Sequence, residues 1–299
     1  MKLALVVGEP MVELLDGSPG STGKGFGGDA LNVAVYLARE APELHVALAS
    51  AAGDDPASDA LVSLCHDEHL DVSWLRRVPG TRLGSYRVTV DASGERSFVY
   101  DRSLSPFRSV LDRGDLLPDP SEVDIVAFSG IALAVQHDRG RRVLFGFAEA
   151  AHAREALVAY DTNHRPALWD IPAEARTWLE RIAPIVDVIL ASADDCRELL
   201  GLREASDLAV ALRALGASEV VVTDGPRPST VAFAGRVEEV PVVVPDAVID
   251  TTAAGDAFDA GYLASRSRGA DPAAAVAAGH RVAARVVAHR GAIVPLRIP

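Results

Sequence analysis

The sequence predicts an α/β fold in which helices cover both faces of a mainly parallel sheet and a small β-sheet forms a lid. Three observations support this prediction. Short apolar strands alternate with amphipathic helical stretches for nearly the whole chain, one β-hairpin pattern interrupts them, and no repeat or linker divides the 299 residues. Near-continuously apolar strands separated by helices are typical of a parallel sheet with both faces covered. We therefore expect a single α/β domain over residues 1–299.

The expected elements follow from the spacing of apolar residues. Strands are expected at residues 2–7, 45–50, 124–128, 156–160, 187–191 and 219–223. Amphipathic helices are expected at residues 29–40, 56–70, 139–153 and 206–215. The last third is rich in alanine, which indicates two closely packed helices at residues 252–265 and 272–289.

The β-hairpin pattern predicts the lid. Residues 83–90 (LGSYRVTV) and 97–102 (SFVYDR) read as strands on either side of a turn-rich link. Together with residues 11–15 (MVELL), they are expected to form a small sheet that projects over a cleft. The lid would comprise about residues 10–28 and 82–108. An extension of the main sheet at its edge is the alternative.

Composition excludes several classes of partner. The formal net charge is −13 and no segment concentrates positive charge, which argues against nucleic acid and anionic membrane surfaces. No run approaches the 18 or so apolar residues of a membrane span, and the apolar stretch at the amino terminus is too short for a secretory signal. The two cysteines, Cys65 and Cys196, have no zinc-type spacing and suit a reducing compartment. We expect a cytoplasmic protein.

The strongest local signal is the run VIDTTAAGDAF at residues 248–258. A β-type segment ends at Asp250, a turn of small residues follows, and a helix is expected to begin near Ala254. The first N–H groups of a helix have no intrahelical partners, so such a terminus can bind phosphate. Asp256 on the first turn would then accept the proton of an attacking hydroxyl. By spacing alone, an acidic residue that only stabilises the helix dipole fits equally well.

A glycine-rich approach to a helix forms the second signal. The run GFGGD at residues 25–29 would place Gly28, Asp29 and Asn32 at one opening. Small residues let a polar ligand come close to the backbone. The alternative is a flexible turn in which Asp29 caps the helix.

Two further clusters indicate a wall for an anionic substrate. Asn163 and Arg165 follow an expected central strand, and ligands of open α/β sheets bind beyond the carboxyl ends of strands. Strand alternation places Tyr100 and Arg102 of the hairpin on one face. Because a guanidinium group can bind a carboxylate through two hydrogen bonds, these arginines point to an acidic ligand.

Taken together, these segments resemble the ribokinase-like (phosphofructokinase B type) sugar kinase family, and within it the 2-keto-3-deoxygluconate kinases. The resemblance spans residues 8–295 and rests on GEPMVEL, GFGGDALNVAVYLAR, SGERSF, SGIALA, DTNHRPALW and VIDTTAAGDAFDAGYLA. It implies a three-layer α/β/α domain whose lid often mediates dimerisation, so a homodimer or higher homo-oligomer is expected.

The resemblance also implies a reaction. The γ-phosphoryl group of ATP would pass, with Mg²⁺, to the terminal (6-)hydroxyl of 2-keto-3-deoxygluconate; a requirement for a monovalent cation such as K⁺ stays open. Fructokinases share the Asn-x-Arg-x-x-Leu-Trp run and are the alternative. A catalytically silent sugar-acid sensor on the same fold is the third interpretation.

Individual residues match the functional positions of that family. Asp256 matches the catalytic base, and the backbone of Ala253, Ala254, Gly255 and Asp256 matches the anion hole. Ser192 and Asp195 match a motif associated with phosphates and, indirectly, the metal, and Thr223 and Gly225 lie where the nucleotide binds. Substrate-binding positions correspond to Gly28, Asp29, Asn32, Tyr86, Tyr100, Arg102 and Arg165, beside Asn163.

Three departures from the family pattern concern contacts with the ligands. Val99 and Asp101 stand where this subgroup often has aromatic lid residues. Thr223-Asp224 replaces a commonly basic stretch, and Ser192 stands where many relatives have Asn. These departures bear on specificity rather than on the class of reaction.

Overall fold

The computed structural model describes residues 1–16, 22–90 and 96–295 of the chain. The hairpin link at residues 91–95, and with it part of the SGERSF motif, lies outside the described residues. Over the described ranges, no helix combines the length and the apolar character needed to cross a membrane.

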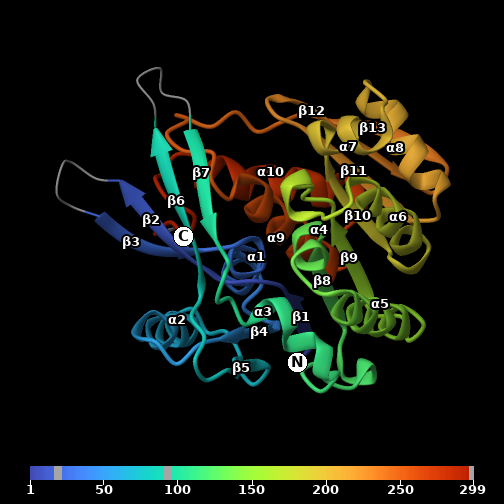
Figure 1. Ribbon diagram of the computed structural model, residues 1–299. Coiled ribbons are helices and arrows are strands. Elements are labelled where there is room, and N and C mark those ends of the chain that lie inside the picture. Colours follow the sequence, from blue (N-terminus) through green and yellow to red (C-terminus); the bar gives the residue numbers. More distant parts are fainter. Residues whose placement is uncertain (17–21, 91–95, 296–299) are drawn as a thin grey trace.

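A large, mainly parallel sheet runs through the middle of the molecule, as predicted (Figure 1). In the described chain its strands are β1 (Leu3–Val7), β4 (His45–Ala52), β5 (Leu75–Arg77), β8 (Ile125–Ser129), β9 (Leu157–Asp161), β10 (Val188–Ser192), β11 (Glu219–Asp224), β12 (Arg227–Phe233) and β13 (Arg236–Val240). Their order is β13-β12-β11-β10-β9-β8-β1-β4-β5. Only the β11–β12 and β12–β13 pairs are antiparallel, so the six expected strands are confirmed, and β5, β12 and β13 add to them.

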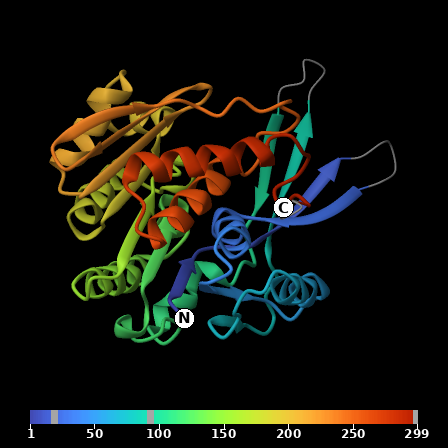
Figure 2. The same cartoon turned by 180° about the vertical axis from the view of Figure 1, so that it is seen from behind.

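Helices cover both faces of this sheet and give three layers (Figure 2). Strand alternation explains the layers, because Leu5 and Val7 of β1 enter one core while Ala4 and Val6 enter the other. The first core contains residues of α3 (Phe107–Val110), α4 (Gly130–Ala134), α5 (Asp138–His152), α6 (Pro172–Ile182), α7 (Ala193–Leu200) and α8 (Ala205–Ala214). The second contains residues of α1 (Asp29–Glu40), α2 (Pro56–Asp67), α9 (Ala254–Ser267) and α10 (Pro272–Val286).

A separate four-stranded sheet projects from one side of the main body (Figure 1). Its strands are β2 (Met11–Asp16), β3 (Thr22–Gly27), β6 (Gly84–Val90) and β7 (Arg96–Asp101), in the order β3-β2-β6-β7. β2 and β6 pair in parallel, and the two outer pairs are antiparallel. The hairpin therefore does not extend the main sheet, and part of the glycine-rich stretch before α1 is a strand rather than a turn.

Small residues let α9 and α10 pack closely, as the alanine-rich sequence predicts. A Cβ atom on Gly261 would lie 2.6 Å from Val282 Cγ2, and one on Gly279 would lie 2.7 Å from Phe258 Cδ2. Contacts this short are sterically forbidden, so both positions need glycine. This packing fixes α9, whose first turn lies at the carboxyl ends of the central strands.

Candidate active site

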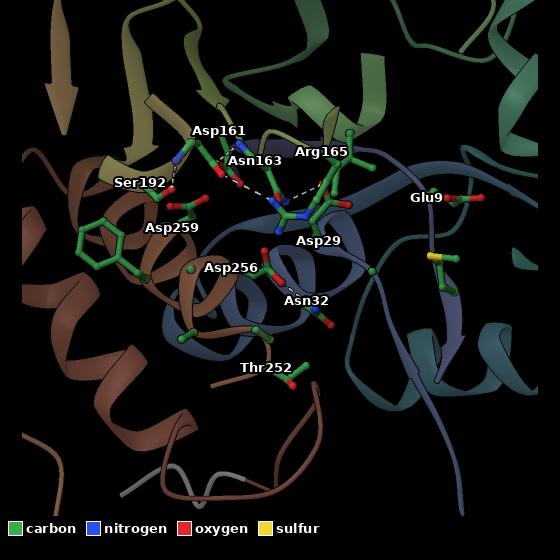
Figure 3. A pocket seen from close by; sticks show the side chains of 18 of the residues that line it. Glu9, Asp29, Asn32, Asp161, Asn163, Arg165, Ser192, Thr252, Asp256 and Asp259 are labelled. Atoms are coloured by element: carbon green, nitrogen blue, oxygen red, sulfur yellow. Dashed lines mark hydrogen bonds and ion pairs between the residues drawn. The ribbon is translucent and has the colours of Figure 1, made fainter. Parts of the chain in front are cut away.

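A pocket of about 480 Å³ lies between the carboxyl ends of the central strands, the first turns of α1 and α9, and the four-stranded sheet (Figure 3). It brings together residues that are far apart in the sequence. The predicted site residues that line it are Gly28, Asp29, Asn32, Tyr86, Tyr100, Arg102, Asn163, Arg165, Ser192, Asp195, Thr223, Ala253, Ala254, Gly255 and Asp256. Gly225 is the exception, because it lies on an exposed turn after β11 and does not line the pocket.

Asp250 shapes the turn that precedes α9. Its Oδ1 accepts a hydrogen bond from the N–H of Thr252 at 2.9 Å, and its Oδ2 accepts one from the N–H of Gly291 at 3.0 Å. The chain then enters the helix through Ala253, whose φ of 60° lies in the left-handed region. A small side chain limits the strain there. The turn is thus held from outside the pocket, which leaves its inner side open.

Backbone N–H groups line this inner side. Among the residues that the structure describes, the N–H groups of Ala253, Gly255 and Asp256 have no protein acceptor. The N–H of Ala254 differs from the expectation, because it donates to the Thr251 carbonyl oxygen at 3.2 Å. Free amides at the positive end of a helix favour an anion such as a phosphoryl group.

Asp256 is half-buried beside these amides and faces Asn32 of α1 (Figure 3). The Asn32 Nδ2 donates to Asp256 Oδ2 at 2.7 Å. Burial, and then the charge of Asp29, raise the pKa of Asp256 to about 6, against the opposing influence of the Asn32 hydrogen bond and Arg165. A carboxylate with this pKa is ionised at neutral pH and accepts a proton more readily than an ordinary aspartate.

The raised pKa of Asp256 predicts how activity depends on pH. If Asp256 must be deprotonated to act as a base, kcat/KM should fall as the pH decreases through about 6. Asn32→Ala removes a hydrogen bond that lowers the pKa, so the acidic limb should move to higher pH. Initial rates of the wild type and of Asn32→Ala between pH 5 and pH 8 test this prediction. If the acidic limb lies at the same pH in both proteins, Asp256 is not the group that titrates.

Asp29 is held by partners from α1, from β8 and from the loop after β9. Its Oδ1 accepts from the N–H of Ala30 at 2.8 Å, and its Oδ2 accepts from the hydroxyl of Ser129 and from Asn163 Nδ2 at 3.3 Å. Gly28, with φ 102°, precedes it as the N-cap of α1, so Asp29 does not cap the helix itself. Its carboxylate is thereby fixed in the pocket wall.

Sequence reasoning missed two acids of the pocket, the half-buried Asp161 and the buried Asp259. Asp161 ends β9, and Asp259 follows Asp256 by three residues and so shares its helix face. Burial, and then nearby carboxylates that include Asp256, raise the pKa of both. Two features of the sequence could have identified them. Asp161 directly follows an expected strand, and Asp259 stands three residues after Asp256.

Two tyrosine rings and Arg102 form the side of the pocket next to the four-stranded sheet, and Arg165 reaches toward the opposite end. The rings of Tyr86 and Tyr100 are 6.0 Å apart, and the Arg102 Cζ lies 4.6 Å from the centroid of Tyr100. Arg165 is about half exposed, and its Nη1 lies 3.7 Å from Asp195 Oδ1. Glu9 and Met11 also line this side, and sequence reasoning did not identify them.

The opposite end of the pocket is formed by α7 and the end of β11. Ser192 caps α7 by accepting the N–H of Asp195 at 3.1 Å, a role that Asn also fills well. Asp195 Oδ2 accepts from Thr162 Oγ1 and from the N–H of His164. Thr223 Oγ1 donates to the carbonyl oxygen of Ala191 at 3.2 Å. These bonds hold the polar groups of this end in place.

The residue after Thr223, Asp224, does not add free negative charge to that end. Its carboxylate is paired with Arg197 and Arg227, and these bonds hold its pKa below the ordinary value. Thr223-Asp224 replaces a commonly basic stretch, but the arginines of α7 and β12 neutralise the negative charge that Asp224 brings.

The charges of the pocket favour a bound cation. Its lining includes six carboxyl side chains and two guanidinium groups. No group of three or more potential ligands that could hold a metal ion occurs within the described residues. These residues fit a Mg²⁺ ion bound mainly through phosphate oxygens and water, with Asp195 as the candidate outer contact.

A model of the pfkB family of carbohydrate kinases matches residues 1–299. The chain belongs to this family. This carbohydrate kinase is 34% identical to the 2-dehydro-3-deoxygluconokinase of Escherichia coli strain K12 over 98% of its own length and 97% of that protein. It is 31% identical to the fructokinase of Vibrio alginolyticus over 91% of its length and 86% of that protein.

A solved structure confirms the ribokinase-like fold of this carbohydrate kinase. Aminoimidazole riboside kinase from Salmonella enterica, complexed with aminoimidazole riboside and an ATP analog, superimposes with a TM-score of 0.86 and 26% identity. The match covers 97% of this chain and 95% of that one. The likeness therefore includes the four-stranded sheet as well as the three-layer body.

Proposed function

We propose that this carbohydrate kinase transfers the γ-phosphoryl group of ATP to the 6-hydroxyl of 2-keto-3-deoxygluconate (2-dehydro-3-deoxygluconate). One observation carries the proposal: the Asp256 carboxylate lies beside the free N–H groups of Ala253 and Gly255 in a pocket that also contains two arginines. The nearly full-length identity to the 2-dehydro-3-deoxygluconokinase of Escherichia coli supports this acceptor.

The geometry supports direct, in-line transfer. Asp256, held by Asn32, takes the proton of the acceptor hydroxyl while that oxygen forms its bond to the γ-phosphorus and the bond to the β,γ-bridging oxygen breaks. The free amides at the start of α9 stabilise the negative charge on the phosphoryl oxygens. Mg²⁺, bound to the phosphates, would supply further positive charge.

The two ends of the pocket would bind the two substrates. Arg102 and Arg165 would bind the carboxylate of the sugar acid, with Asp29 and Asn163 near its hydroxyl groups. ATP would lie toward α7, with its phosphates near Ser192 and Asp195, as expected for a relative of a kinase solved with an ATP analog. We assign the four-stranded sheet as the lid of a single-domain enzyme.

Two properties outside the pocket remain predictions. We expect a homodimer or higher homo-oligomer formed through the lid, which light scattering of the purified protein would test. We also expect a cytosolic enzyme, because it would use ATP and its two cysteines are both unpaired.

A comparison of acceptors tests the proposal. The purified protein, with MgATP, should phosphorylate 2-keto-3-deoxygluconate with a kcat/KM at least about tenfold above that for fructose, since fructose has no carboxylate for the arginines. ADP release and ³¹P NMR of the product measure the rate and the position of transfer. Faster turnover of fructose would identify a fructokinase, and binding without transfer would support a silent sensor.

A further inference from the structure

Glu9 is a buried acid of the pocket to which the proposed mechanism gives no role. It follows β1 in the short link to β2, and its side chain is 1% exposed. Figure 3 shows Glu9 apart from the Asp256–Asn32 pair. A buried carboxylate is costly unless hydrogen bonds and opposite charge compensate it, so its partners are informative.

Both oxygens of the Glu9 carboxylate accept hydrogen bonds from the segment that directly follows β7. Oε2 accepts from Arg102 Nε at 2.5 Å, and Oε1 accepts from the hydroxyl of Ser105 at 2.5 Å. The backbone closes the same loop, because the N–H of Ser105 donates to the carbonyl oxygen of Arg102. Glu9 is therefore held by two donors and cannot rotate without losing one of them.

The remaining contacts fix the plane of the Arg102 guanidinium. Its Cζ lies 4.6 Å from the ring centroid of Tyr100, and its Nη2 lies 3.3 Å from Met11 Sδ. In the described part of the protein, Nη1 has no acceptor, although Arg102 lines the pocket. One edge of the guanidinium thus binds Glu9, and a donor on its other side is available to a ligand.

The main chain leaves room for this arrangement. A Cβ atom on Gly84 would lie 2.9 Å from Glu9 Oε1 and 3.5 Å from Arg102 Cγ. A larger residue at the start of β6 would press on the Glu9 carboxylate, whereas its distance from Arg102 Cγ would be an ordinary contact. Glycine at position 84 therefore leaves room for the Glu9 carboxylate where it pairs with Arg102.

We propose that Glu9 is a positioning residue, which holds Arg102 in the orientation that binds the carboxylate of the acceptor. This inference rests on the proposed sugar-acid kinase activity. A long arginine side chain has many rotamers, and fixing it before the substrate arrives removes part of the entropy cost of binding. Glu9 touches neither the transferred phosphoryl group nor Asp256, so its effect should appear in acceptor binding.

A double-mutant cycle of Glu9→Ala, Arg102→Ala and the combined variant tests the proposal. Glu9→Ala should raise the KM for the sugar acid about tenfold and change kcat less than about threefold, because it acts on binding. In a protein that already carries Arg102→Ala, adding Glu9→Ala should raise the KM for the sugar acid less than about twofold further, because the effect of Glu9 passes through Arg102. The KM for ATP should not change. If the increase in KM of the double variant equals the product of the two single increases, the residues act independently and the proposal is overturned.

A conservative variant separates orientation from charge. Glu9→Gln keeps a carbonyl oxygen for Arg102 Nε, and the Ser105 hydroxyl can turn to accept from the new amide. Its KM should therefore stay within about threefold of the wild type. A KM as high as that of Glu9→Ala would overturn a positioning role. If Glu9→Ala does not fold, Glu9→Gln and Ser105→Ala carry the test, and Ser105→Ala should raise the same KM moderately.

The wild-type enzyme distinguishes the failure of this inference from that of the proposed function. If fructose is the better acceptor, the proposed function fails, and the carboxylate-binding role of Arg102 fails with it. If the sugar acid is the better acceptor but the losses in the cycle multiply, only the role of Glu9 fails. Thermal unfolding of each variant, measured in parallel, detects loss of folded protein.

Discussion

Asp256→Asn is expected to lower kcat by about 10²- to 10⁴-fold, the usual contribution of a positioned general base. The amide keeps the size of the side chain but cannot take the proton of the acceptor hydroxyl. The backbone N–H groups at the start of α9 remain, so the Kd for ATP should change less than about twofold. Steady-state assays and calorimetric titration with ATP measure the two quantities separately.

Asp246→Asn provides a matched control for this substitution. Asp246 is an exposed aspartate on the segment that leads to α9, and it does not line the pocket. The control should keep wild-type kcat. Near-normal turnover in Asp256→Asn would remove Asp256 from the mechanism, and a large loss in both variants would point to a general effect of the changed charge.

Arg102→Ala should lower kcat/KM for the sugar acid by about 10- to 150-fold, which corresponds to the roughly 1.5–3 kcal/mol of a hydrogen bond to a charged group. The loss should be much smaller with fructose, which has no carboxylate. The kcat/KM of Arg102→Lys for the sugar acid should lie between that of the wild type and that of Arg102→Ala, because an ammonium group keeps the charge but not the planar pair of donors. Rates with both acceptors at fixed MgATP give the comparison.

The control for Arg102 is Arg142→Ala on the exposed face of α5, where, among the described residues, the guanidinium pairs with Asp138 alone. It should leave both acceptors unaffected. Arg102→Ala also strands the buried Glu9 carboxylate, so its melting temperature should fall relative to that of Arg142→Ala. Equal losses for the sugar acid and for fructose would show that Arg102 does not recognise the carboxylate.

Much of the fold could be predicted because its signals are local. The six expected strands are runs of apolar residues between turns, and α1 begins at Asp29 where a glycine-rich stretch ends. The β12–β13 hairpin was missed for a physical reason. Its turn contains Ala234 and Gly235, both with positive φ, and Ala is a weak signal for a conformation that usually takes Asn or Gly.

The sequence by itself determined that α9 begins beyond a small-residue turn with Asp256 on its first turn, because apolar periodicity, small side chains and free helical amides are properties of one short segment. Only the tertiary structure decided which distant groups surround Asp256. The lining of one pocket by Asp161 and Asp259 and the contact of Glu9 with Arg102 join residues nearly a hundred positions apart. Burial and neighbouring charge set the pKa of Asp256, and neither exists until the strands, helices and lid have come together.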